Sequence, residues 1–297
     1  MNPTRLRPLR LLPLLLLALA PIAALAAPLS KAAPALPGAS GIGSATSAWH
    51  LVWADNFRQS SRQPNPSNWT YDTGPRKDGN MELEIYCGYG SNQGPCNARQ
   101  PNVWVSHGKL HIVAREPRPG VYTSARLKTE GLRSFQYGRM EARIKIPRGQ
   151  GMWPAFWMLG DNIEQVGWPK CGEFDIMENI GKTPATVYGS VHGPGFIGHI
   201  ITNRYSLPSH ADFYKKFHVY GMIWSPKKVE FYVDSPKNIY ATETPADLPP
   251  GARWPFDDGK YFFILNLAVG GGWPGNPDAT TRFPAKMLVD WVRVYQR

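Results

Sequence analysis

The segment Tyr137–Ile146 alternates two kinds of side chain with a period of two. From Met140 onward the even positions are apolar and the odd positions are charged. Successive side chains of a β-strand point to opposite faces, so this pattern is typical of a strand with one face on a core and the other in water. The segment therefore predicts a half-buried β-strand near the middle of the chain.

Shorter β-rich runs show the same alternation, and turn residues separate them. These runs are Lys109–Arg115, Val187–His192, Phe217–Trp224, Val229–Asp234, Tyr261–Val269 and Leu288–Tyr295. Convincing amphipathic helices are scarce. The pattern predicts an all-β domain built as a two-sheet antiparallel β-sandwich.

The first residues, 1–26, have the features of a secretory signal peptide. Basic residues precede the Leu-rich run Leu11–Ala20, and Ala24–Ala26 offers a small-residue cleavage site. The run is too short for a membrane helix, which needs ~20 apolar residues. We expect export to the extracellular space or the periplasm, with no membrane attachment after the signal is removed.

Residues 27–47 consist mainly of Ala, Pro, Gly and Ser and contain no aromatic residue. Such a segment cannot bury enough apolar area to order itself, so we expect a flexible linker. All eleven tryptophans lie beyond it. We therefore expect one folded domain over residues 48–297.

The chain has a formal net charge of +11. The positive residues are scattered and do not form a run or a basic helix, which argues against nucleic acid as a partner. A basic surface fits anionic walls or acidic polysaccharides without selecting either. We take a monomer as the default state.

Three cysteines are present. Cys87 and Cys96 bracket a short polar loop and are expected to form a disulfide in an oxidising compartment. Cys171 is then unpaired, and a buried small hydrophobic residue is the favoured interpretation over a reactive thiol. Three cysteines at these spacings also make a poor zinc site.

The most informative segment for function is Gly172–Asn179, in which Glu173, Asp175 and Glu178 interrupt an apolar strand-like run. Buried carboxylates are costly unless they are used or paired. Simple alternation places Glu178 on the opposite face from the other two, and a β-bulge near Ile176 and Met177 would bring it back. We therefore predict a bulged strand on a concave sheet.

Three acids on one face suit glycosidic bond hydrolysis, in which one carboxylate attacks and one carboxylic acid donates a proton. Asp175, between the two glutamates, would raise the pKa of one and keep the other ionised. Two alternatives compete with this interpretation. The acids could pair with Arg139 or Arg143 across strands, or they could hold calcium, although calcium sites favour wrapping loops over a stiff strand.

Tryptophans with neighbouring polar groups occur in several segments. The clearest are Trp153–Trp157, Trp168 and the Gly-rich Gly270–Gly275 around Trp273. Flat rings beside hydrogen-bonding groups suit the apolar faces and hydroxyl edges of sugars. Core packing is the competing interpretation for each ring.

The spacing Glu-x-Asp-x-x-Glu, preceded by Trp153–Gly160 and Trp168–Gly172, resembles the bacterial laminarinase branch of glycoside hydrolase family 16. Further segments resemble family landmarks in the family's order. These are Gly79–Glu84, Thr123–Thr129, Tyr137–Arg143, Leu265–Gly271 and Val289–Tyr295. Lichenases of the family carry the shorter Glu-x-Asp-x-Glu, which makes a strict lichenase a poor match.

The resemblance implies a concanavalin-like β-jelly roll with a concave substrate cleft and a retaining mechanism. It implies that Glu173 is the nucleophile, Glu178 the acid/base and Asp175 their electrostatic helper. It also implies sugar contacts from five further residues, namely Asn80, Trp153, Trp168, His192 and Trp273. For His192 a hydrogen-bonded strand residue is an equal alternative. The Cys87–Cys96 segment departs from the shorter stretch expected and leaves the number of subsites open.

Many family members hold a structural calcium on the convex side. The matching positions are Asn56, Gly108 and Asp290, whose oxygen donors fit that ion. The competing interpretation is that Asp290 only caps a turn. No cofactor is expected for the chemistry itself.

We therefore expect a secreted, retaining endo-β-1,3-glucanase that acts on laminarin-like chains and extends to mixed β-1,3-1,4-glucans. Two other hypotheses stand beside it. One is a β-glucan-binding protein without catalysis on the same fold, and the other is the same chemistry on agarose or another galactan.

Overall fold

The computed structural model describes residues 48–75 and 79–297. The predicted signal peptide and linker, residues 1–26 and 27–47, lie outside the described residues. Within the described part, no helix is long and apolar enough to span a membrane.

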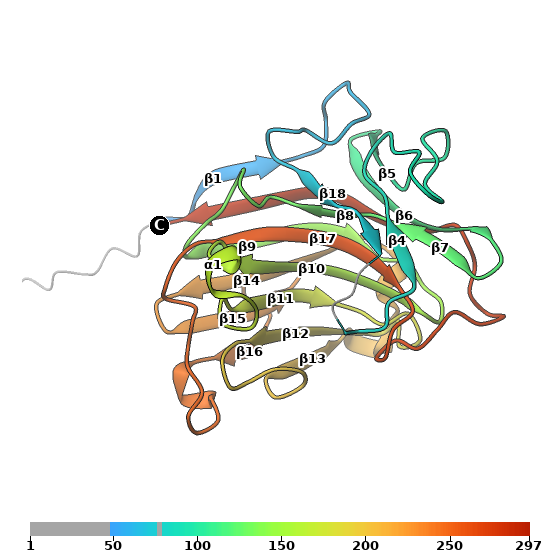
Figure 1. Cartoon of the computed structure of the whole chain (residues 1–297). Helices are drawn as coiled ribbons and strands as arrows, with labels where there is room; N and C mark the ends of the chain where they lie inside the picture. The colour runs from blue at the N-terminus through green and yellow to red at the C-terminus, as the bar shows by residue number, and fades with distance from the viewer. Residues whose placement is uncertain (1–47, 76–78) are drawn as a thin grey trace, which may run out of the picture. The chain divides into compact units, whose positions relative to one another are not determined.

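Two β-sheets form the domain (Figure 1). The seven-stranded sheet runs in the order β13 (Thr202–Ser206), β12 (Thr186–His192), β11 (Glu173–Glu178), β10 (Met152–Gly160), β17 (Tyr261–Val269), β8 (Arg126–Lys128) and β2 (Thr70–Asp72). We call it the inner sheet because the cleft described below lies on it.

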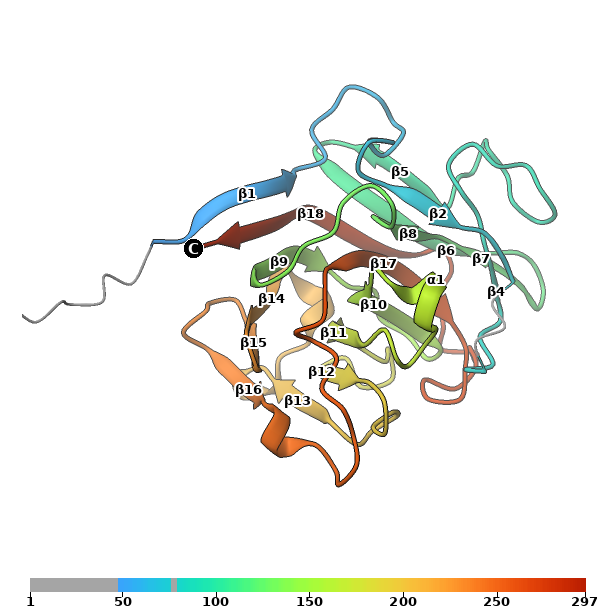
Figure 2. The ribbon, with the colours of Figure 1, turned by 60° about the vertical axis from the view of Figure 1, so that its left-hand side comes forward.

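The second, outer sheet has eleven strands. Its main path is β16 (Ile239–Glu243), β15 (Lys228–Val233), β14 (His218–Ser225), β9 (Gly138–Lys145), β18 (Ala285–Gln296), β6 (Lys109–Arg118), β7 (Val121–Ser124), β4 (Glu84–Tyr86) and β3 (Gly74–Pro75). Off this path, β1 (His50–Asp55) pairs with β18, as Figure 2 shows, and β5 (Val103–Ser106) pairs with β6. The helical elements are α1 (Ile163–Val166) and the 3-10 turns η1 (Pro208–His210), η2 (Phe213–Lys215) and η3 (Pro245–Asp247).

The predicted two-sheet sandwich is confirmed, and all strand pairs are antiparallel except β4 with β7. The alternating segment forms β9, in which Met140, Ala142 and Ile144 are fully buried in the core. The parallel β4–β7 pair departs from the purely antiparallel expectation. Strands β5 and β6 lie between β4 and β7 in the chain, so the local sequence does not indicate the relative direction of the pair.

The hydrophobic core lies between the sheets, and β17 is the strand buried along its whole length. Its odd-numbered residues, such as Phe263 and Leu265, belong to the main core. Phe262 and Ile264 belong to a smaller cluster with Leu159 and Cys171. Burying a large apolar side chain contributes ~1.5–3 kcal/mol, so β17 and β10 give the inner sheet a rigid centre.

Candidate active site

The strand β11 lies between β10 and β12 and contains a β-bulge. Asp175 pairs with Ser190 and Glu178 with Tyr188, so three steps along β11 match two along β12. The register with β10 shifts at the same place, between Phe156 and Trp157. The predicted bulge is confirmed, and it turns Glu178 back toward the face that carries Asp175.

The core side of β11 shows what holds this strand in place. Phe174, Ile176 and Met177 all belong to the main core and are almost fully buried. The Phe174 ring stacks on Phe256 at a centroid distance of 4.4 Å. Truncating a buried aromatic residue costs ~3–5 kcal/mol, which indicates how firmly the core holds a strand whose other face carries three acids.

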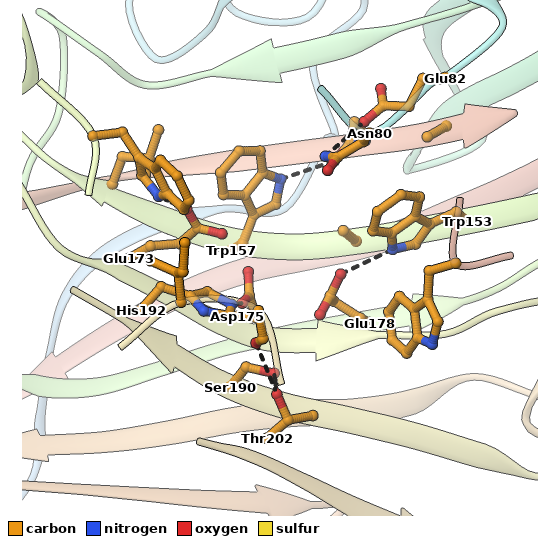
Figure 3. A pocket seen from close by; sticks show the side chains of 18 of the residues that line it. Asn80, Glu82, Trp153, Trp157, Glu173, Asp175, Glu178, Ser190, His192 and Thr202 are labelled. Carbon is orange, nitrogen blue, oxygen red and sulfur yellow. Dashed lines mark hydrogen bonds and ion pairs between the residues drawn. The ribbon is translucent and has the colours of Figure 1, made fainter. Parts of the chain in front are cut away.

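The opposite side of β11 presents the three acids to a cleft of about 640 Å³. Figure 3 shows the carboxylates of Glu173, Asp175 and Glu178 on this face, with Trp153 beside Glu178. Asp175 is buried, whereas both glutamates are half-buried. The arginines considered as partners lie on the outer sheet, where Arg143 pairs with Asp290 and Arg139 with Glu141. The arginine-pairing alternative is therefore wrong.

Glu173 begins β11 and accepts a hydrogen bond from the indole N–H of Trp168, with Nε1 2.6 Å from Oε2. It also shares a hydrogen bond with Asp175. Burial, followed by the charge of Asp175, raises the pKa of Glu173 to about 8. The indole opposes this rise because it donates to the ionised form.

Asp175 lies between the glutamates and in contact with a histidine. His192 ends β12 beside Glu173, and its Nε2 lies 2.8 Å from Oδ2 of Asp175. Burial raises the pKa of Asp175 to about 7, and the hydrogen bond with Glu173 opposes the rise. The structure thus places His192 against Asp175 in the wall of the cleft, with 9% of the residue exposed.

Glu178 ends β11 and accepts a hydrogen bond from Trp153, with Nε1 2.8 Å from Oε1. Burial and the charge of Asp175 raise the pKa of Glu178 well above its usual value. Three desolvated carboxyl groups cannot all be ionised near neutral pH. Burial and the charge of Asp175 raise the pKa of both glutamates, so at least one carboxyl group of the three keeps a proton.

Trp168 stands on the loop between β10 and β11, which returns to the sheet at Gly172. Gly172 has φ +78°, and a Cβ there would lie 2.2 Å from the hydroxyl of Tyr261. Glycine is therefore required where the chain enters β11. Beside it, Cys171 is buried with Leu159 and Phe262, and burial raises the pKa of its thiol to about 11. The thiol is a packing group, as expected.

Trp273 follows β17 in a glycine-rich loop and packs edge-on against three rings. The centroid distances are 4.9 Å to Tyr188, 5.5 Å to Trp153 and 5.5 Å to His199. Gly272 donates its backbone N–H to the carbonyl of Asn80, with a distance of 2.9 Å. This contact joins the Trp273 loop to the segment that carries the predicted Asn80, and both residues line the cleft.

Several residues that line the cleft were not assigned from the sequence. Trp157 donates its indole N–H to Asn266 at 2.8 Å, and Arg126 stacks over the Trp157 ring at 4.6 Å. Asn80 donates to Glu82 with a distance of 3.3 Å. We call Asn80, Glu82, Arg126, Trp157 and Asn266 the β8–β17 flank of the cleft. All five lie within or beside the quoted motifs, and strand alternation could have placed Trp157 and Asn266 on the cleft face.

Cys87 and Cys96 form the expected disulfide.

The residues expected at a calcium site lie beside the part of β18 where this strand changes partners. β18 pairs with β6 up to Val289 and with β1 from Val292, and Asp290 is an extra residue in its register with β9. Asn56 follows β1 and Gly108 precedes β6, and the registers of these strands with β18 place both positions beside the Asp290 segment. Asp290 directs Oδ2 to Arg143 at 2.6 Å, and Asn56 accepts from Arg293.

One group of side chains in the described part of the chain could hold a metal ion within the cleft. Ligand atoms of Glu173, Asp175 and His192 lie within 4.8 Å of one another. Two carboxylates and one imidazole suit several divalent metals. The same groups carry the hydrogen bonds described above, and these orient them toward the cleft.

Comparisons with known proteins agree with this geometry. Residues 90–293 match the model of "Glycosyl hydrolases family 16". The chain is 40% identical over 261 residues to a beta-glucanase of Rhodothermus marinus, covering 84% of this chain and 85% of that protein. It superposes on the endo-beta-1,3-glucanase of Pyrococcus furiosus with a TM-score of 0.74 and 46% identity, covering 84% and 94% of the two chains. The laminarinase catalytic domain of Thermotoga maritima gives 0.74 and 41%, with 84% and 99% covered.

Proposed function

Because the chain belongs to family 16 of the glycosyl hydrolases, we propose that it is an endo-β-1,3-glucanase that cleaves laminarin-like chains. It is a retaining β-glucan hydrolase, and the proposal concerns its linkage preference. One observation carries the hydrolase chemistry, namely the bulged strand that places Glu173, Asp175 and Glu178 on one face of the cleft. The similarity to the endo-beta-1,3-glucanase of Pyrococcus furiosus and the laminarinase of Thermotoga maritima supports the β-1,3 linkage.

The first chemical step uses both glutamates. Glu178 donates its proton to the glycosidic oxygen while an oxygen of Glu173 attacks the anomeric carbon, and the bond between that carbon and the leaving oxygen breaks. Asp175 and the Trp168 N–H hold the attacking carboxylate in place. The result is a covalent glycosyl-enzyme and a free chain end.

The second step reverses the roles. Glu178, now ionised, takes a proton from water, and the water oxygen attacks the anomeric carbon and releases Glu173. Two inversions give net retention. The charge of Asp175 raises the pKa of Glu178 and so favours return of the proton to it.

The walls of the cleft suit a neutral glucan. Trp153, Trp168 and Trp273 offer flat apolar surfaces, and the β8–β17 flank offers amide, carboxylate and guanidinium groups for hydroxyls. The same surfaces would accept a chain with occasional β-1,4 linkages. We therefore include mixed β-1,3-1,4-glucans in the proposal.

We also propose a structural calcium ion at Asn56, Gly108 and Asp290. Its support is the strand register, which brings the three positions beside the same part of β18, and the oxygen donors that they offer. The ion would contribute stability and take no part in the chemistry.

Export is the third proposal, and it places the protein outside the cell or in the periplasm. Its support is the leader-like composition of residues 1–26 and the Cys87–Cys96 disulfide, since disulfides persist in oxidising compartments.

The direct test of the activity is hydrolysis of laminarin followed by proton NMR. Release of internal fragments with the β-anomer appearing first is expected. Glu173→Gln and Glu178→Gln should each remove most turnover, while Glu164→Gln, an exposed glutamate on α1, should match the wild type. Near-wild-type activity in either cleft variant refutes the assignment.

Parallel assays separate the competing hypotheses. Binding of laminarin without release of reducing ends would favour a glucan-binding protein. Hydrolysis of agarose or another galactan in preference to laminarin would keep the chemistry and replace the substrate.

A further inference from the structure

The loop between β12 and β13 folds back over the cleft. Its base is tied down by a pair of backbone hydrogen bonds between Gly193 and Phe196, and the Phe196 ring is fully buried. It returns to the sheet at Ile201, which is also buried. The four residues between these anchors, 197–200, are exposed, and three of them line the cleft. We call residues 197–201 the cleft turn.

The cleft turn lies above the end of the inner sheet. The carbonyl of Gly198 accepts from the hydroxyl of Thr202 at 3.5 Å, and Thr202 in turn accepts from Ser190 at 3.0 Å. Figure 3 shows Ser190 and Thr202 on the side of the catalytic strand away from Asn80 and Glu82. We call this side the β12–β13 flank. The cleft turn is therefore hydrogen-bonded, through Thr202, to the side chains that line this flank.

A ring contact joins the cleft turn to the Trp273 loop. The ring of His199 meets Trp273 edge-on at a centroid distance of 5.5 Å. Trp273 is itself supported by Tyr188, the β12 partner of Glu178, and by Trp153, which donates to Glu178. Rings at this separation leave no room for a sugar between them. The contact closes the β12–β13 flank next to the proton donor.

The opposite side of the cleft has a different construction. The β8–β17 flank is lined by side chains of sheet residues and of the Asn80–Glu82 segment, which is held to the Trp273 loop by a backbone hydrogen bond. Its residues line the cleft and are bonded to one another or to neighbouring side chains, as in the hydrogen bond from Trp157 to Asn266. The two flanks therefore differ in construction, because sheet residues supply three of the five side chains of one flank while an exposed turn covers the other.

We propose that His199 determines specificity by restricting the β12–β13 flank to unbranched glucan. The inference rests on the proposed function and deepens it. A β-1,6-linked glucosyl branch adds a whole ring beside the main chain. An unbranched chain needs only a small displacement of the cleft turn, whereas a branched unit needs the His199–Trp273 contact to stay open.

The experiment compares kcat/KM on a linear β-1,3-gluco-oligosaccharide and on a β-1,6-branched β-1,3-glucan. Aromatic contacts of this kind contribute modestly, so His199→Ala should raise kcat/KM on the branched glucan by about threefold to tenfold and change the linear value by less than about twofold. His199→Phe keeps a ring against Trp273 and should retain the wild-type preference. His50→Ala, an exposed histidine on β1, is the matched control.

The outcomes distinguish failure of the role of His199 from failure of the proposed function. If the wild type hydrolyses both glucans and His199→Ala leaves their ratio unchanged, His199 does not set specificity and the proposed function stands. A parallel fall on both substrates also overturns the inference, since it indicates a general structural role. If the wild type hydrolyses neither glucan, the proposed function fails and this inference fails with it.

Discussion

Replacing Trp168 with phenylalanine removes the hydrogen-bond donor to Glu173 and leaves an aromatic ring in the cleft wall. The bond lost is short, with Nε1 2.6 Å from Oε2. Hydrogen bonds to charged groups contribute ~1.5–3 kcal/mol. Because 49% of Trp168 is exposed, water partly replaces the donor and the lower figure applies. At ~1.4 kcal/mol per factor of ten, we expect about a tenfold loss of kcat/KM.

The same variant should also change the pH dependence of kcat/KM. The indole N–H stabilises the ionised carboxylate and opposes the rise in the pKa of Glu173. Without it the pKa of Glu173 rises further, by about one unit for ~1.4 kcal/mol. Glu173 must be ionised to attack, so the acidic limb of the kcat/KM profile should move to higher pH.

Trp153→Phe is the matched partner of this variant. It removes the equivalent bond to Glu178, 2.8 Å long, which likewise opposes the rise in the pKa of that residue. Glu178 must be protonated to act as the acid, so here the alkaline limb should move to higher pH. The two glutamates titrate together with Asp175, so each variant can shift both limbs of the profile. The larger shift is expected in the acidic limb for Trp168→Phe and in the alkaline limb for Trp153→Phe. If Trp168→Phe chiefly moves the alkaline limb, the assignment of nucleophile and acid is reversed.

Two further predictions concern stability. The pKa of Glu173 is raised from 4.5 to about 8, so the unfolded chain ionises first, and the free energy of unfolding should fall as pH rises from about 4.5 to 8. Glu173→Gln should flatten that fall by up to ~1.4 kcal/mol per pH unit, and equal slopes in denaturant titrations would count against the raised pKa. Removal of calcium with a chelator should lower Tm by about 5–10 °C, from ~2.7 kcal/mol of binding stabilisation at ~2–4 °C per kcal/mol. Asp290→Asn should abolish that response, and a wild-type Tm indifferent to the chelator would exclude the ion.

The sequence predicted eight of the eighteen described strands, namely those with an alternating or a continuously apolar run. Tyr261–Val269 was expected as a strand and forms β17 with the same bounds. The segment expected as Val229–Asp234 forms β15 one residue earlier, since Asp234 leaves the ladder to bind His218. Short strands such as β2 and β3 lack a period long enough to read, and the partner of β4 depends on a distant part of the chain.

The catalytic acids were predictable because their charge conflicts with the apolar strand in which they lie. Three acids in an apolar strand demanded a bulge, and β11 contains one. The proposed role of His199 was not predictable, because it depends on a contact with Trp273, which lies 74 positions further along the chain. Arg126 was similarly hidden, since its stacking on Trp157 arises only after β8 and β10 are both placed beside β17. Packing between residues far apart in the chain does not change the period of the hydrophobic pattern, so that pattern cannot predict it.

The bulge in β11 puts two consecutive residues, Ile176 and Met177, into the core between the catalytic acids. The separation of the acids is therefore governed from beneath the sheet, while substrate fit is governed by loops above it. These two properties can change independently during evolution. A designer could exchange the cleft turn or the Trp273 loop to alter which polysaccharide is accepted, and would expect the proton-transfer machinery to survive the exchange. Repacking beneath the strand would have the opposite effect, weakening turnover on every substrate alike.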